Sequence, residues 1–292
     1  MTTSGHGLDR RTVLKRLATG GAAIGGLSGV AAAGGDNGDY SAPADYPLVS
    51  TRGHFDEDGN LTASGTTYNY YGEGDWARYT ESWHDEIVVF VHGWSQDDEN
   101  DDDIDGAYTC ELALEENGVY QTNVGYSWDS DRGWWTAVDI AKRNGPKLAN
   151  WIANWVNDGG DPIRLVGHSL GAQVVVSALN NLHAWGYYNA VETVSLVGAA
   201  IPDQSVSTED DYGDDIEYAT GSFGNFYKTD DAVLDWAYSS AEWDTALGEE
   251  GIQDGLAAPY NYQERDVTAQ VPDHNSYYEP GDGCMPAVVD SW

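Results

Sequence analysis

Positive charge is the scarcest property of this chain of 292 residues. It has 13 Lys and Arg residues against 49 Asp and Glu residues, a formal net charge of −36 at pH 7. Residues 1–33 hold four of these bases and one of the acids, which leaves nine bases and 48 acids for the rest. The shortage argues against a nucleic-acid partner, because phosphates are neutralised by Lys and Arg. Like charges repel in dilute buffer, whereas in molar salt the Debye length falls to about 3 Å. The composition therefore predicts a protein adapted to very high salt.

Cysteine is also scarce, since Cys110 and Cys284 are the only two. Outside the cell an even number permits a disulfide, which would join an early helix to the segment near the carboxyl end. Closing a loop of that length would stabilise the fold by about 4 to 5 kcal/mol in the chain-entropy model. The sequence leaves open whether the two sulfurs meet. The acidic chain is not expected to be disordered, because 41% hydrophobic and 12% aromatic residues are enough for a core.

The apolar stretch near the amino end is short. It runs from Leu17 to Val30, is rich in Gly and Ala, and falls below the roughly 20 apolar residues that a membrane span needs. Arg10 and Arg11 precede it in a segment that resembles a twin-arginine export signal, and a small-residue cleavage pattern follows. We therefore expect a signal peptide over 1–33 that the twin-arginine export machinery recognises, a linker over 34–47 and one domain over 48–292. The expected location is outside the cell, without stable membrane insertion, and an uncleaved anchor is the alternative.

The most informative stretch is Gly-His-Ser-Leu-Gly at 167–171. The apolar run at 163–166 leads into it as a short buried strand, and residues 170–179 lead out of it as a helix. A serine between glycines on such a strand-to-helix turn is typical of a nucleophile elbow, in which the tight bend exposes the hydroxyl above the sheet. The amino end of the helix also favours negative charge there. Ser169 is therefore the candidate nucleophile.

Two further motifs accompany this elbow. The apolar run at 87–91 ends in His92-Gly93-Trp94, and Gly-Tyr-Ser-Trp-Asp stands at 125–129. Together with the elbow, these motifs resemble the α/β-hydrolase superfamily, and specifically its lipase- and esterase-like branch, from Glu86 to about Gln204. The alternation of strands and helices along the chain favours the same fold, a mostly parallel central sheet with helices on both faces. In such sheets ligands bind at the carboxyl ends of the strands, where Ser169 and the His-Gly-Trp turn fall.

The resemblance implies a serine hydrolase that cleaves carboxylic esters through a Ser-His-Asp triad and an acyl-enzyme. The order along the chain is then serine, acid, histidine. Only His183 and His274 follow Ser169, and His183 lies on the helix that leaves the elbow and points away from the strand ends. His274, in a loop after the last predicted strand, is therefore the candidate base.

Several carboxylates compete for the place of the acid. Asp231 follows the predicted strand at 223–228 and is favoured, because its turn resembles the acid loop of many relatives. Asp230 is the neighbouring alternative. Asp203 is a third, because pancreatic-type lipases carry their acid one strand earlier.

The resemblance also nominates an oxyanion hole. Relatives with a His-Gly-x turn use the backbone N–H of x and that of the residue after the nucleophile, which are Trp94 and Leu170 here. Each donor can contribute on the order of 3 kcal/mol to lowering the barrier.

No cofactor is implied. The residues at 101–106 resemble the start of a calcium loop, but the twelfth position is Leu112, so a solvated acidic loop is favoured over a metal site.

The sequence does not identify the ester, which could be a small molecule or a lipid. The short acidic stretch between Asp203 and Ser222 is unlike a long lid, which favours an esterase or a lipase with little interfacial gating. One alternative keeps the triad but cleaves a polyester, thioester or peptide bond. The other is a catalytically silent surface protein that binds ligands through exposed aromatic side chains.

Overall fold

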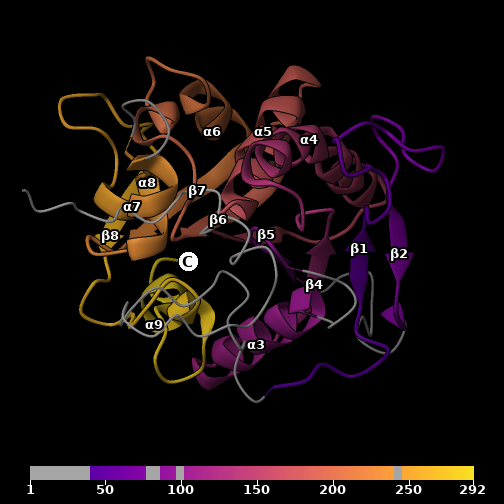
Figure 1. The fold of residues 1–292 in the computed structure, drawn as a ribbon, viewed down its shortest axis with the longest axis horizontal. Coiled ribbons are helices and arrows are strands. Elements are labelled where there is room, and N and C mark those ends of the chain that lie inside the picture. Colours follow the sequence, from indigo (N-terminus) through magenta and orange to yellow (C-terminus); the bar gives the residue numbers. More distant parts are fainter. Residues whose placement is uncertain (1–39, 77–85, 97–101, 240–244) are drawn as a thin grey trace, which may run out of the picture.

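The structure is a computed structural model that describes residues 40–76, 86–96, 102–239 and 245–292. The predicted signal peptide at 1–33 and the first part of the predicted linker lie outside the described residues. Eight strands form one sheet in the order β2-β1-β4-β3-β5-β6-β7-β8 (Figure 1). Every neighbouring pair is parallel except β1 with β2. The strands are β1 (Leu48–Ser50), β2 (Tyr71–Glu73), β3 (Ile87–Val91), β4 (Thr122–Ser127), β5 (Ile163–His168), β6 (Val191–Val197), β7 (Thr220–Tyr227) and β8 (Tyr262–Asp266).

Helices cover both faces of this sheet. In Figure 1 α4, α5 and α6 lie on one side of it, and α3 and α9 lie on the other. The helices are α3 (Asp102–Glu116), α4 (Trp134–Asn157), α5 (Gly171–Ala184), α6 (Gly213–Ala219), α7 (Ala232–Ser239), α8 (Leu247–Glu250) and α9 (Met285–Val289), with the 3-10 turns η1 (Asp203–Val206) and η2 (Ser276–Tyr278). The predicted architecture, a mostly parallel central sheet with helices on both faces, is confirmed.

The apolar run of β3 explains how one strand serves two cores. Ile87, Val89 and Val91 belong to the cluster under α4 and α5, whereas Val88 and Phe90 belong to the cluster under α3 and α9. All five are buried, because a parallel strand covered on both faces has no solvent side. Side chains of alternate residues point to opposite faces, so a continuous hydrophobic run is what such a strand requires.

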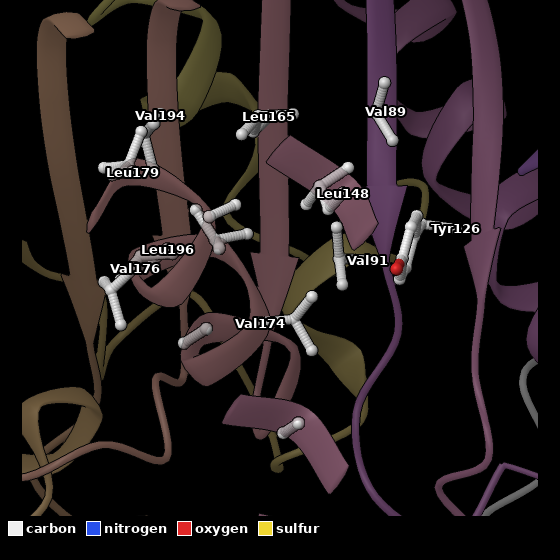
Figure 2. Close-up of a cluster of buried hydrophobic side chains, with 14 of the residues drawn as sticks. Val89, Val91, Tyr126, Leu148, Leu165, Val174, Val176, Leu179, Val194 and Leu196 are labelled. Atoms are coloured by element: carbon white, nitrogen blue, oxygen red, sulfur yellow. The ribbon is translucent and has the colours of Figure 1, made fainter. Parts of the chain in front are cut away.

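The larger core lies between the sheet and the helix pair α4 and α5. Figure 2 shows valine and leucine side chains of β3, β5 and β6 against those of the two helices, with Leu148 from α4 and Val174 from α5. Burial of each such side chain stabilises the fold by about 1.5 to 3 kcal/mol. Helix α5 starts at the nucleophile turn, so this packing also fixes the direction in which the turn leaves the sheet.

The acidic segment after residue 101 is a helix, and the expected solvated loop there is wrong. Helix α3 starts at Asp102, Asp103 is buried, and its carboxylate accepts hydrogen bonds from the Arg52 side chain and the Ser127 hydroxyl. Acidic residues in the first turn are favoured by the positive end of the helix dipole. The carboxylate of Asp105 accepts from the backbone N–H of Ala42 at 2.7 Å. These acids therefore hold protein segments together.

The end of the predicted linker is also part of the packed structure. Tyr46 is 2% exposed and joins the cluster under α3, where its hydroxyl donates to the carbonyl of Ala107. Together with the bond from Ala42 to Asp105, this contact ties residues 42–46 to α3. A linker over 34–47 therefore extends too far toward the domain. Among the described helices, none is long and apolar enough to cross a membrane.

Candidate active site

The site is organised by the turn between β5 and α5. Ser169 has a φ of 51°, in the left-handed region that residues other than glycine rarely occupy. Three backbone hydrogen bonds hold it there. Its N–H donates to Val197 at 3.1 Å, and its carbonyl accepts from Ala172 at 3.1 Å and from Ala200 at 3.0 Å. A strained residue persists only where its surroundings fix it, and such residues concentrate at functional sites.

The glycines beside the serine are required by close backbone approaches. A Cβ on Gly171 would lie 2.2 Å from the carbonyl oxygen of Val91, at the end of β3. A Cβ on Gly93 would lie 2.8 Å from the Cβ of Ser169. The nucleophile turn and the His-Gly-Trp turn are therefore in direct contact, and only glycine fits at these two positions.

The structure brings together Ser169, His274 and Asp231. His274 Nε2 lies 2.8 Å from Ser169 Oγ, and His274 Nδ1 lies 2.8 Å from Asp231 Oδ2. Because an ionised carboxylate only accepts hydrogen bonds, Nδ1 carries the proton and Nε2 is left to accept from the serine hydroxyl. The exposed fractions are 6% for the serine, 4% for the histidine and 1% for the aspartate. This arrangement can take a proton from the serine hydroxyl.

Asp231 remains ionised in spite of its burial. Burial alone would raise the pKa of Asp231, but His274 and the hydrogen-bond donors around the carboxylate hold that pKa below its usual value. The backbone N–H groups of Val233 and Leu234, at the start of α7, donate to Oδ1 at 3.1 and 3.2 Å. The hydroxyl of Tyr277 donates to Oδ2 at 3.1 Å.

The two alternative acids lie elsewhere. Asp230 is exposed and pairs with the Nζ of Lys228. Asp203 begins η1, where its backbone N–H donates to Thr245. Of the three candidates, Asp231 is the one that contacts the His274 ring.

The predicted oxyanion donors flank the serine. Among the described residues, neither the backbone N–H of Trp94 nor that of Leu170 has an acceptor. His92 holds the first of these turns, because its Nε2 accepts from the N–H of Trp128 at 3.1 Å and its Nδ1 donates to the carbonyl of Gly93 at 2.9 Å. Burial lowers the pKa of His92 to about 3, so the ring stays neutral and can accept at Nε2. Two unpaired N–H groups beside a nucleophile can bind a developing negative charge.

His168 is a functional neighbour that the sequence analysis missed. Its Nε2 donates to the backbone carbonyl of His274 at 2.8 Å, which ties the residue before the nucleophile to the loop of the base. Burial lowers the pKa of His168 to about 3, and nearby His274 acts in the same direction. The residue before the serine in Gly-x-Ser-x-Gly is variable in the general motif, so nothing in the sequence indicated this contact.

Aromatic side chains gather beside the turn His92-Gly93-Trp94, the predicted oxyanion turn. The indole N–H of Trp94 donates to the carbonyl of Arg132 at 2.7 Å, and its ring packs edge-on against Trp134 and parallel to Trp236. Nothing in the sequence indicated Trp236 as a member of this cluster. It comes from α7, which begins directly after Asp231, so the acid loop also supplies part of this aromatic cluster.

A small pocket lies beside Asp231 and His274. It lies between the loop at 228–233 and the loop at 272–275, and both Asp231 and His274 line it. Within the described ranges, no group of three or more His, Cys, Asp or Glu side chains could hold a metal ion.

The two cysteines are buried thiols and form no disulfide. Burial raises the pKa of both thiols above the usual value. They belong to the same core cluster under α3 and α9, but the disulfide that the sequence permits is not formed in the structure.

Main-chain hydrogen bonds connect the strand ends that carry the site. The N–H of Ser169 reaches Val197 at the end of β6, and the next N–H, of Gly198, reaches Phe226 in β7 at 3.1 Å. The N–H of Val267, just after β8, reaches Tyr227 at 2.8 Å. The loops that carry Ser169, Asp231 and His274 therefore start from strand ends held in register by the backbone.

Comparisons with known proteins show what this chain is similar to. The family described as "Protein of unknown function (DUF726)" matches residues 119–288. An esterase from Rhizomucor miehei is similar in structure, with a TM-score of 0.40 and 13% sequence identity over 70% of this chain and 72% of that one.

Two curated proteins are similar in sequence. The "Transmembrane and coiled-coil domain-containing protein STS1" of Oryza sativa subsp. japonica is 26% identical over 226 residues, which cover 71% of this chain and 33% of the rice protein. The "Uncharacterized membrane protein C6F6.13c" of Schizosaccharomyces pombe is 28% identical over 159 residues, 54% of this chain and 19% of the yeast protein. The chain thus spans a third or less of the length of these relatives.

Proposed function

The chain belongs to the family described as "Protein of unknown function (DUF726)", and from its own site we propose that it is a serine hydrolase that cleaves carboxylic esters. The observation that supports this proposal is the unbroken line of hydrogen bonds from Ser169 through His274 to Asp231, with two contacts of 2.8 Å. The line ends at a strained serine between a helix start and two unpaired N–H groups. No part of a purely structural core needs that combination.

The reaction follows from the positions of these groups. Ser169 Oγ attacks the ester carbonyl while His274 Nε2 takes the hydroxyl proton. The tetrahedral oxyanion is bound by the N–H groups of Trp94 and Leu170. His274 then gives the proton to the leaving alcohol, and an acyl group remains on the serine. A water molecule, activated by the same histidine, attacks this acyl-enzyme and releases the acid.

Asp231 supports both proton transfers without taking the proton. Its carboxylate fixes His274 in the tautomer with hydrogen on Nδ1 and stabilises the imidazolium once Nε2 is protonated. The donors that keep the carboxylate ionised also keep its affinity for the proton low. Replacement of the carboxylate by an amide would leave the shape of the site but lose this charge.

The aromatic cluster favours an ester with an apolar acyl group. Trp94, Trp134 and Trp236 lie together on the side of the oxyanion turn, where the carbonyl of a bound ester would have to sit.

Secretion through the twin-arginine route and function in very high salt complete the proposal, and these rest on the amino-terminal segment and on the net charge of −36. The substrate is a small-molecule or lipid ester, and the site needs no cofactor for this chemistry.

The test is hydrolysis of p-nitrophenyl butyrate and p-nitrophenyl palmitate in multimolar KCl by the wild type and by Ser169→Ala. We expect the variant to lose all activity above background, and the two wild-type rates separate an esterase from a lipase. Ser195→Ala is the matched control, because Ser195 is a buried serine on β6 whose Oγ accepts from the indole N–H of Trp292. It should keep the wild-type rates.

A fluorophosphonate probe separates the alternatives if neither ester is cleaved. Such a probe phosphonylates an activated serine whatever bond the enzyme prefers. Labelling that depends on Ser169 would indicate cleavage of another bond, such as a polyester, thioester or peptide bond. A folded wild type that cleaves no ester and takes no label would overturn the proposal in favour of a silent binding protein.

A further inference from the structure

The carboxylate of Asp231 receives more donors than a triad requires. Its Oδ1 accepts two backbone N–H groups, and its Oδ2 accepts both His274 Nδ1 and the hydroxyl of Tyr277. Two donors on each oxygen occupy all of its usual acceptor sites. Of these four donors, the Tyr277 hydroxyl is the one that belongs to a side chain other than His274.

Tyr277 is placed at this position by its surroundings. Its side chain is fully buried, and its ring lies over Gly198, where a Cβ would come within 2.6 Å of the ring carbon Cε2. Gly198 has a φ of 56° and directly follows β6. A residue with a side chain at 198 would therefore push the phenol away from the acid.

The loop that carries the base also carries the phenol. Tyr277 comes three residues after His274, and their rings meet edge to face with centroids 6.1 Å apart. Asp273 fixes the turn between them, because its side chain accepts from the N–H of Asn275 and the hydroxyl of Ser276, both at 3.0 Å. One rigid turn thus delivers two donors to the same carboxylate oxygen.

The phenol can only donate in this place. Burial and the charge of Asp231 raise the pKa of Tyr277 well above its usual value, so the hydroxyl keeps its proton. A carboxylate oxygen that accepts two hydrogen bonds has its negative charge divided between them. The pull of that oxygen on His274 Nδ1–H is therefore weaker than it would be with a single donor.

We propose that Tyr277 is a positioning residue of this site, whose hydroxyl fixes the orientation of the Asp231 carboxylate and limits its pull on His274. This inference rests on the proposed function, because it assigns a role within the triad. Loss of the hydroxyl would free one acceptor site on Oδ2 and concentrate the charge on the histidine. The imidazolium would then be stabilised more strongly, and His274 would hold its proton to higher pH.

The experiment is the pH dependence of kcat/KM for Tyr277→Phe, which removes the hydroxyl and keeps the ring. We expect kcat/KM at its optimum to fall by about tenfold, because the carboxylate loses the hydrogen bond that fixes its orientation toward His274. The acid limb of the profile should move to higher pH by about half a unit. Tyr126→Phe is the matched control, since Tyr126 is equally buried but its hydroxyl donates to Asn144. Its acid limb should coincide with that of the wild type.

Two results would overturn the inference while the wild type remains active through Ser169. One is a Tyr277→Phe enzyme with the rate and the profile of the wild type. The other is a lower rate with an unmoved acid limb, which is what a loss of packing alone would produce. If the wild type itself has no activity that depends on Ser169, the proposed function fails. NMR titration of His274 in both proteins then tests the contact, because its midpoint must still move upward in Tyr277→Phe.

Discussion

Replacement of His168 by glutamine should make the stability of the protein less dependent on pH. His168 is buried and neutral, and its pKa is lowered from 6.5 to about 3 in the folded protein, mainly by burial. In the unfolded chain the imidazole meets water and regains its ordinary pKa of about 6.5. Between these two values the unfolded state binds one more proton than the folded state. Stability contributed by this group is therefore present above pH 6.5 and is lost as the pH falls toward 3.

The size of the effect follows from proton linkage. Each pH unit in this window costs about 1.4 kcal/mol for one such group, so a fall from pH 7 to pH 5 removes about 2 kcal/mol of unfolding free energy. His92 is buried in the same way, with a pKa of about 3, and adds a similar loss in the wild type. His168→Gln removes only the contribution of His168. Its amide can still donate to the carbonyl of His274, so the contact seen at 2.8 Å has a replacement.

The assay is guanidinium-induced unfolding of wild type and His168→Gln at pH 7 and pH 5. The many carboxylates also titrate in this range, but their contributions cancel in the difference between the two proteins. We expect the variant to lose about 2 kcal/mol less than the wild type between the two pH values. His183→Gln is the control, because the His183 side chain is 37% exposed and pairs with Asp215. Equal losses in wild type and His168→Gln would refute the reasoning.

Two further substitutions test the site and its support. Asp231→Asn should lower kcat by about 10⁴-fold at unchanged secondary structure, because an amide cannot stabilise the imidazolium or select its tautomer. The rate is measured with p-nitrophenyl butyrate, and a loss below tenfold would contradict the role of Asp231. Gly171→Ala should lower the unfolding free energy by about 3 kcal/mol, because its Cβ would lie 2.2 Å from the Val91 carbonyl. Gly133→Ala is the control, because a Cβ at residue 133 would have no neighbouring atom within 4 Å, and it should leave the midpoint of thermal unfolding unchanged. Equal midpoints for the two variants would argue against the close approach of Gly171 to Val91.

The sequence predicted those strands, turns and helices that depend on residues close together in the chain. The strand Ile87–Val91 has the predicted bounds, and the strand, turn and helix around Ser169 follow as expected, because hydrophobic runs and glycine positions act within a few residues. His274 could be reached by elimination, since only two histidines follow the serine. Asp231 was ranked above Asp230 by the resemblance of its turn to the acid loop of relatives, and it is the one that contacts His274.

The remaining contacts join residues that are far apart in the sequence, and no local sequence pattern predicts such pairs. His168 and His274 are separated by 106 residues and Tyr277 and Asp231 by 46, and in each case one hydrogen bond joins them. A helix was expected around Cys110, but its acidic first turn was taken for a loop, because Asp residues are poor helix formers in the interior, whereas the first turn favours them. Tyr46 was assigned to a linker because the surrounding residues are polar, and only tertiary packing buries it.

The backbone bonds between the strand ends determine which kinds of sequence change the site can survive. The bonds of Ser169 to Val197 and of Gly198 to Phe226 involve only main-chain atoms. Substitution of the side chains along β6 and β7 leaves such bonds intact, so divergent descendants can keep the same three functional groups in register. Insertion or deletion of a single residue at one of these strand ends shifts the whole ladder. We expect length changes between homologues to collect in the loops beyond these bonds, and the strand ends themselves to keep a constant length.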